Sequence, residues 1–350
     1  MKRFGNLLVI TILLMLLHLQ LVKAQNTDGP GAYMTSVTNA QGEMNKKYMA
    51  YVSAAAHGKR LKKVEKLRQA AIESITQSKY NTIGLPLYKG DNLLRQKSID
   101  YINFCYKIFN EDYAHIVNME EISEQSFDEM QTYLLLQEKT GEKLQEANDN
   151  INKAYKEFGT KYNVNIVEGE KTELGQKMET ASKLNHYYNQ VYLVFFKCNW
   201  QDGKLTEALN NKKLNDAEQS RNALIKYATE GLLALDSMKS FMGDPSLAVA
   251  CRQALQFYKK NAEVDLPKQL DYYLKQENFE KMKKAFDAKS GSDRKKEDVD
   301  AFNKGVKEIN AAVNNFNQSI NTTNNNRNQA MQNWENSSKA FFDTHMPYYK

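Results

Sequence analysis

The chain has 350 residues, of which 26% are charged and 41% are hydrophobic, and its formal net charge is +6. It is long enough to bury a real core, which excludes a small scaffold held together by disulfides. Only 5 prolines and 16 glycines interrupt it, and lysine, glutamate, glutamine, asparagine and alanine are frequent. This composition predicts a nearly all-helical protein.

The first 24 residues have the pattern of a secretory signal peptide. Lys2 and Arg3 are followed by the apolar run Leu7–Leu17 and by the small-residue site Val22-Lys23-Ala24. The run is too short for a confident membrane span, and no later stretch predicts a transmembrane helix after signal removal. We therefore expect export to the periplasm, the cell surface or the medium. Three lysines or arginines leave with the signal, so the net charge falls to +3 and gives no reason to expect a nucleic-acid partner.

Residues 25–39 are polar and without periodicity, and we expect a mobile tail there. Helices are then predicted over 41–56 and 59–78, separated by His57-Gly58. The second helix carries apolar residues at three- and four-residue spacing on one face. Its other face holds a basic group that could contact an anionic partner or could simply be solvated, the candidate partner-binding residues being Lys59, Arg60, Lys62, Lys63 and Lys66.

A joint between two helices is predicted at Tyr88-Lys89-Gly90-Asp91. Glycine after a helix end adopts the left-handed conformation at little cost, and aspartate can cap the next helix. The helix that follows, over 92–119, is apolar around much of its circumference. The next helix starts with the capping box Ser126 and Glu129 and continues for about 35 residues with heptad-like spacing. A linker is expected over 163–175.

The second half of the chain gives a similar order. Helices are predicted over 178–200 and 214–238, with a break at Gln201-Asp202-Gly203. A second joint follows at Phe241-Met242-Gly243-Asp244, in which Gly243 and Asp244 have the roles of Gly90 and Asp91. Pro267 should kink or restart the next helix at Asp265, which the first half is not expected to do. The last helix, over 298–342, is rich in asparagine and should be locally weak.

The two joints lie 153 residues apart, and residues on both sides of them match at the same offset. Ungapped matches across a Gly-Asp turn indicate an internal duplication. The predicted fold is therefore an all-α bundle of long, coiled-coil-like helices, built from two duplicated helical units. The predicted division is a signal peptide at 1–24, the tail at 25–39, unit one at 40–165 and unit two at 166–350.

No catalytic residue, cofactor site or metal site is predicted from the sequence. It has no phosphate-binding glycine loop, HExxH, CxxC or Gly-x-Ser-x-Gly motif. Asp112 and His115 share a helix face, but the position 153 residues after His115 is a lysine, so a symmetric di-metal site is not expected. The cysteines Cys105, Cys198 and Cys251 are interpreted as small buried residues, and one disulfide with one free thiol is the alternative.

The signal, the two joints and the linker motif Ile166-Val167-Glu168-Gly169-Glu170 resemble a family of uncharacterised exported bacterial surface proteins. The resemblance implies export and brings no activity. We expect a non-enzymatic helical protein with a binding or structural role in the cell envelope. Its partner would be an envelope or extracellular protein, or an anionic surface polymer. The alternative is a periplasmic bundle that binds a metal or a ligand.

Overall fold

A computed structural model describes residues 29–57, 61–112, 125–166 and 172–349. Every regular element within these ranges is a helix, which confirms the predicted all-α class. The chain forms two compact units, one of residues 1–190 with 339–350 and one of residues 191–338. Both boundaries fall inside long helices, α6 and α10, and therefore differ from the predicted division at 165.

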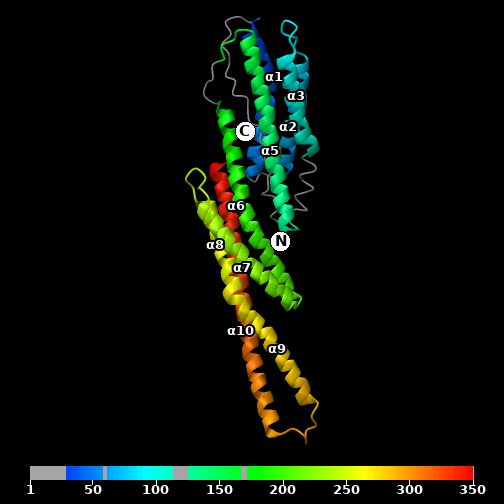
Figure 1. Ribbon diagram of the computed structural model, residues 1–350, viewed down its shortest axis with the longest axis vertical. Coiled ribbons are helices and arrows are strands. Elements are labelled where there is room, and N and C mark those ends of the chain that lie inside the picture. Colours follow the sequence, from blue (N-terminus) through cyan, green and yellow to red (C-terminus); the bar gives the residue numbers. More distant parts are fainter. Residues whose placement is uncertain (1–28, 58–60, 113–124, 167–171, 350) are drawn as a thin grey trace. The chain divides into compact units, whose positions relative to one another are not determined.

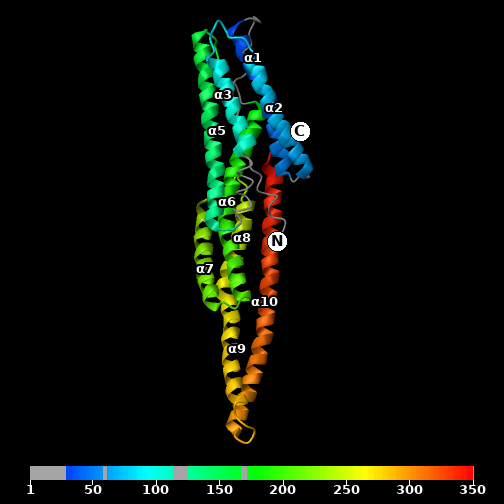
Figure 2. The same ribbon diagram turned by 90° about the vertical axis from the view of Figure 1, so that its right-hand side faces the viewer.

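The first unit consists of helices that run side by side, as Figures 1 and 2 show for α1, α2, α3 and α5. Helix α1 packs along α2, and α3 packs against both α2 and α5. The elements are α1 (Pro30–Ala56), α2 (Leu61–Ile83), α3 (Leu93–Lys107), the π-helical turn η2 (Ile108–Asp112), α5 (Phe127–Lys161) and the first part of α6 (Glu173–Asn210). The Ser126 hydroxyl accepts from the backbone N–H of Glu129 at 3.1 Å, so the predicted cap of α5 is present.

The expected mobile tail at 25–39 is wrong from residue 30 onward, because α1 begins at Pro30. Proline suits a first helical turn, since it has no N–H to leave unpaired there. Tyr33, Met34 and Val37 are buried and continue the apolar face of the predicted helix backwards. The spacing of these apolar residues favours a helix more strongly than the polar residues before them favour a tail. Residues 25–28 lie outside the described ranges.

Each joint is a tight turn with two residues in the left-handed region. Lys89 and Gly90 have φ of 51° and 80°, and the equivalent residues Met242 and Gly243 have φ of 51° and 84°. Asp91 Oδ1 accepts from the N–H two residues on at 2.8 Å. Asp244 makes the same contact in the second unit. An L side chain is strained in the left-handed region, so glycine at the second position spares the turn a second strained residue after Lys89 or Met242.

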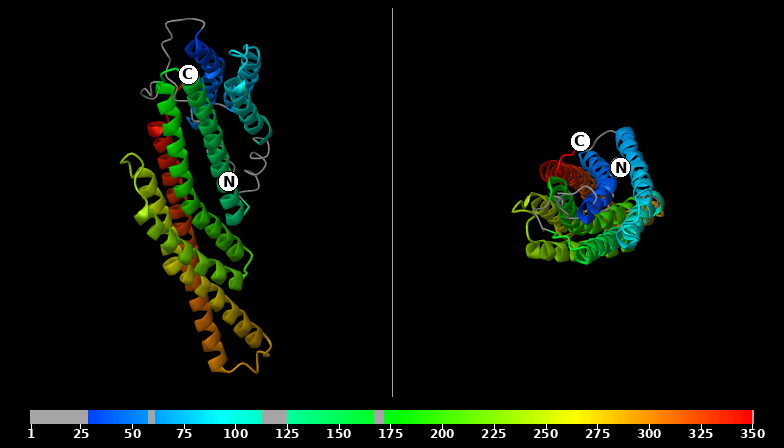
Figure 3. Two further views of the ribbon diagram at one scale, coloured as in Figure 1. Left: turned by 45° about the horizontal axis from the view of Figure 1, so that its top comes forward. Right: turned by 90° about the horizontal axis from the view of Figure 1, so that it is seen from above.

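The second unit contains two helical hairpins. Figure 3 shows α7 beside α8, and Figure 2 shows α9 beside α10. The elements that follow the second part of α6 are α7 (Leu214–Ser237), α8 (Ser246–Lys260), the π-helical turn η3 (Asn261–Asp265), α9 (Leu266–Asp287) and α10 (Lys296–His345). Phe195 of α6 stacks on Trp334 of α10, with ring centroids 4.3 Å apart, in the core of this unit.

The predicted helix break at Gln201-Asp202-Gly203 does not occur, because α6 runs through it. Glycine inside a helix costs only about 1 kcal/mol relative to alanine. Gln201 and Asp202 are buried, and Asp202 makes an ion pair in the core, which holds this turn in the helix. Gly203 is exposed. Tertiary contacts therefore decide the conformation here.

Pro267 follows a restart of the helix, as predicted, since η3 ends at Asp265 and α9 begins at Leu266. The first half is not expected to kink or restart, yet it contains a π-helical turn as well; the residues at which a restart would fall, from 113 onward, lie outside the described ranges. In the first half η2 occupies Ile108–Asp112, which are the positions 153 residues before η3. The π-helical turn thus forms in unit one without a proline at the matching place. Helices α3 and α8, and the starts of α2 and α7, also match at this offset, while the duplication itself stays a prediction.

Candidate functional site

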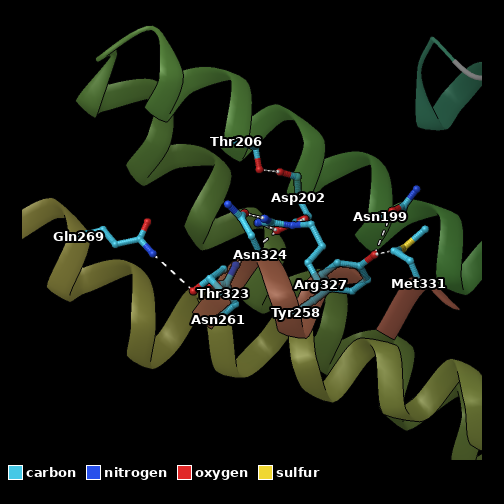
Figure 4. A network of polar contacts seen from close by, with 10 residues as sticks. All are labelled: Asn199, Asp202, Thr206, Tyr258, Asn261, Gln269, Thr323, Asn324, Arg327 and Met331. Atoms are coloured by element: carbon cyan, nitrogen blue, oxygen red, sulfur yellow. Dashed lines mark hydrogen bonds and ion pairs between the residues drawn. The ribbon is translucent and has the colours of Figure 1, made fainter. Parts of the chain in front are cut away.

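A largely buried ion pair joins α6 and α10 in the second unit (Figure 4). Arg327 Nε lies 2.6 Å from Asp202 Oδ2, and Arg327 Nη2 lies 3.1 Å from Asp202 Oδ1. The side chain of Asp202 is 4% exposed and that of Arg327 is 22% exposed. Two parallel hydrogen bonds of this kind fix the orientation of both side chains. Burial of the guanidinium opposes its charge, but the hydrogen bond and the charge of Asp202 raise the pKa of Arg327.

Other polar side chains around this pair connect α8 and η3 to α6 and α10 (Figure 4). The Tyr258 hydroxyl of α8 donates to Asn199 Oδ1 at 2.9 Å and lies 3.2 Å from Met331 Sδ. Asn261 Nδ2, in η3, donates to Asp202 Oδ1 at 3.4 Å. Burial, and then the nearby negative charge of Asp202, raise the pKa of Tyr258 well above its usual value. The Tyr258 hydroxyl therefore stays protonated near neutral pH and keeps its hydrogen bond to Asn199. Because the contacts of this network link α6, α8, η3 and α10, they hold these elements together.

The π-helical turn η3 receives support from α7. Arg221 Nε donates to the backbone carbonyl of Ala262 at 2.8 Å, and Arg221 Nη1 pairs with Glu218. A π-helical turn shifts the normal hydrogen-bond ladder, so an added donor stabilises it. Arg221 thus combines a pair within α7, to Glu218 three residues earlier, with a tertiary contact to η3.

The solvent face of α10 carries almost no charge over residues 309–334. Within residues 309–334 the only charged side chain is Arg327, and it turns toward Asp202. Thirteen of these 26 residues are asparagine or glutamine, and all thirteen are exposed. We call these side chains the amide face. They are Asn310, Asn314, Asn315, Asn317, Gln318, Asn321, Asn324, Asn325, Asn326, Asn328, Gln329, Gln332 and Asn333.

This composition is costly for a helix. Asparagine costs up to about 0.7 kcal/mol relative to alanine in a helix interior, so ten asparagines cost roughly 7 kcal/mol. Exposed helix faces usually carry glutamate and lysine, which favour the helix and form stabilising pairs. The rest of the described surface has many such pairs, for example Lys275 with Asp271 and Lys304 with Glu308. The amide face therefore differs from the remaining helix surface of the same unit.

A groove between α9 and α10 lies along one edge of the amide face. Its volume is about 500 Å³. Helix α10 contributes Ala312, Asn315 and Ser319, and α9 contributes Pro267, Lys268, Asp271, Tyr272 and Lys275. The Tyr272 ring stacks on Phe316 with centroids 4.2 Å apart, and Ser319 Oγ accepts from Gln269 Nε2 at 3.3 Å. These contacts fix two of the groove's side chains in place.

A second groove, in unit one, lies between α3 and α5 and has a volume of about 440 Å³. Lys97, Asp100, Lys143 and Glu146 line it together with Phe104. Opposite charges from both helices face the same space, which is typical of a solvated seam between two charged helix faces.

Of the predicted basic face, Lys62, Lys63 and Lys66 are exposed on α2. Lys59 and Arg60 lie outside the described residues. Arg68 contacts Glu65 within the helix, with Nη2 2.6 Å from Oε1. The structure thus places three lysines of the face on the surface, and their role in binding stays a prediction.

The remaining sequence-based candidates have structural surroundings. All three cysteines are buried and free, which agrees with their interpretation as small core residues and not with the disulfide alternative. His115 lies outside the described residues. Elsewhere in the described ranges, no group of three or more histidine, cysteine, aspartate or glutamate side chains is arranged to hold a metal ion. No described helix is both long and apolar enough to cross a membrane.

The sequence analysis did not identify the network of Asp202, Arg327, Tyr258 and Asn261. Its contacts join residues that are 59 to 125 positions apart in the chain, which no local pattern reveals. One signal was present: Arg327 is the single charge in a long uncharged stretch, so a buried partner was to be expected for it.

Comparison of the chain with protein-family models, with curated proteins and with solved structures found no match. The resemblance to exported surface proteins therefore stays an expectation from the sequence.

Proposed function

We propose that this chain is an exported, non-enzymatic helical protein that binds a partner in the bacterial cell envelope through the amide face of α10. Export rests on the signal-like pattern of residues 1–24. The observation that carries the binding role is the exposure of thirteen amides on a stretch whose only charge, Arg327, is paired with Asp202.

The chemistry of amides favours holding a partner over transforming it. An asparagine or glutamine side chain donates and accepts hydrogen bonds, does not titrate near neutral pH and is not a nucleophile. A surface composed of such groups has no long-range attraction for ions. Binding should therefore depend little on salt, whereas binding through Lys62, Lys63 and Lys66 would weaken as salt screens their charge.

Site-specific photo-crosslinking in intact cells tests this proposal. A photoreactive residue replaces Asn321 on the amide face or, as the matched control, Lys304 on the exposed charged part of the same helix. We expect a discrete adduct from position 321 and not from position 304. Equal adducts from both positions, or none from 321, would contradict the proposed surface.

The basic face offers a second comparison. Changing Lys62, Lys63 and Lys66 to glutamate should leave the adduct at position 321 unchanged if α10 is the binding surface. If this triple variant abolishes the adduct, the basic face is the principal contact.

A further inference from the structure

We infer that the groove between α9 and α10 binds an uncharged glycan, an inference that rests on the proposed function of the amide face and names its ligand class. The groove combines three properties that such a ligand requires. It has neutral hydrogen-bonding groups, an oriented aromatic ring and a hollow of suitable size.

The hydrogen-bonding groups match sugar hydroxyls. Each hydroxyl both donates and accepts, and the Asn315 amide and the Ser319 hydroxyl, which line the groove, do the same. Further amides of α10 continue beyond the groove along the helix. A sugar polymer could therefore contact the same kind of group at successive residues without meeting an isolated charge.

Three charged side chains of α9, Lys268, Asp271 and Lys275, also line the groove, and each is paired with a neighbour on the same helix or on η3. Lys275 Nζ lies 2.6 Å from Asp271 Oδ2, and Lys268 Nζ lies 3.6 Å from Asp265 Oδ1. Each charge of the lining therefore already has a partner of opposite sign, so the groove offers an ionic ligand no unpaired charge. This balance favours an uncharged glycan over an anionic polymer.

The aromatic ring supplies the apolar contact. Tyr272 lines the groove, and its stacking on Phe316 at 4.2 Å fixes the ring. Sugars present C–H groups on the faces of their rings, which pack on aromatic side chains, while their hydroxyls point outward. The volume of about 500 Å³ is within the range of roughly 300–1,000 Å³ that is usual for small-ligand sites.

The test is calorimetric titration of the purified protein with dextran, laminarihexaose and chitohexaose, which are uncharged, and with polygalacturonate, which is anionic. We expect at least one uncharged glycan to bind with an affinity that 0.5 M sodium chloride changes by less than about twofold, because no charges are screened. Binding of polygalacturonate alone, or of no uncharged glycan, would overturn the inference.

A matched pair of variants places the binding in the groove. Asn315→Asp keeps the shape of the side chain but replaces a donor with a charge, and it should weaken glycan binding by about tenfold. Asn317→Asp makes the same change on the same helix outside the groove and should alter the affinity by less than about twofold. Both residues are exposed, so both variants should fold, and circular dichroism checks this. Equal affinities of the two variants would overturn the assignment.

Two further results separate this inference from the proposed function. If the adduct at position 321 persists and joins the chain to a protein, while no uncharged glycan binds, the amide face is a binding surface and the glycan is wrong. If sedimentation shows a dimer that Asn315→Asp dissociates, a second copy of the chain occupies the groove in place of a glycan.

Discussion

Loss of one partner from the ion pair of Asp202 and Arg327 should strongly destabilise the second unit. Arg327→Met removes the charge but keeps much of the side chain. It leaves a carboxylate that is 4% exposed and whose remaining described contact is the weak hydrogen bond from Asn261 Nδ2 at 3.4 Å. Removal of one member of a buried pair costs about 3 to 5 kcal/mol. We expect a loss of this size in the free energy of unfolding, measured by guanidinium denaturation with helical circular dichroism.

The reverse change should cost less. Asp202→Asn leaves the guanidinium, which is 22% exposed and still contacts Asn324, so water can solvate part of it. We expect a loss of about 1 to 3 kcal/mol for this variant. The double variant Asp202→Leu with Arg327→Met should recover most of the stability, because a buried pair can often be replaced by apolar side chains. A cost below about 1 kcal/mol for Arg327→Met would show that the pair is solvated and would refute this reasoning.

Three further predictions follow from local geometry. Gly203→Ala should stabilise the protein by about 0.5 to 1 kcal/mol in thermal or denaturant unfolding, because Gly203 is helical and a Cβ there meets nothing within 4 Å; a destabilised variant would show that α6 is broken at this point. Hydrogen bonds from Lys161 and from the backbone N–H of Leu93 hold the pKa of Asp91 below its usual range. Because the folded pKa is lowered, Asp91 contributes stability above its unfolded pKa of about 3.9 and loses that contribution as the pH falls through the folded value. Asp91→Asn should therefore lower the unfolding midpoint at pH 7, and its difference from the wild type should shrink as the pH is lowered below about 3.9; a difference that stays constant would contradict the assignment. Burial raises the pKa of Cys198 to about 12, so alkylation followed by mass spectrometry should modify this thiol in guanidinium and leave it unmodified in the folded protein; rapid native modification would contradict its burial.

Much of the fold could be predicted because local signals agreed with the tertiary structure. The joints at Gly90 and Gly243 combine a glycine at positive φ with an aspartate cap, and both signals are readable within four residues. The cap at Ser126 is equally local. The break expected at Gly203 was wrong because its neighbour Asp202 pairs with a residue 125 positions away, which no local pattern reveals.

The π-helical turn of unit one was missed for a related reason. Proline marks a helix restart in the sequence of unit two, but no residue type at Ile108–Asp112 marks the equivalent turn. The candidate site was partly visible, because the asparagine content of the last helix is a property of composition. That all thirteen amides are exposed, and that Arg327 turns away from them, depends on how α6 packs against α10 within the second unit.

The central claim is that the amide face of α10 is the surface that meets the partner. Hydrogen exchange of peptides from residues 309–326, measured before and after addition of an envelope fraction from the producing cells, tests it most directly. A helix rich in asparagine is weak, so the backbone N–H groups of residues 309–326 should exchange quickly in the free protein. Their exchange should slow markedly when the partner binds. We expect this protection in the wild type and its loss when Asn314, Asn315 and Asn321 are changed to aspartate. Unchanged exchange at 309–326, or protection confined to residues 62–68 of the basic face, would contradict the claim.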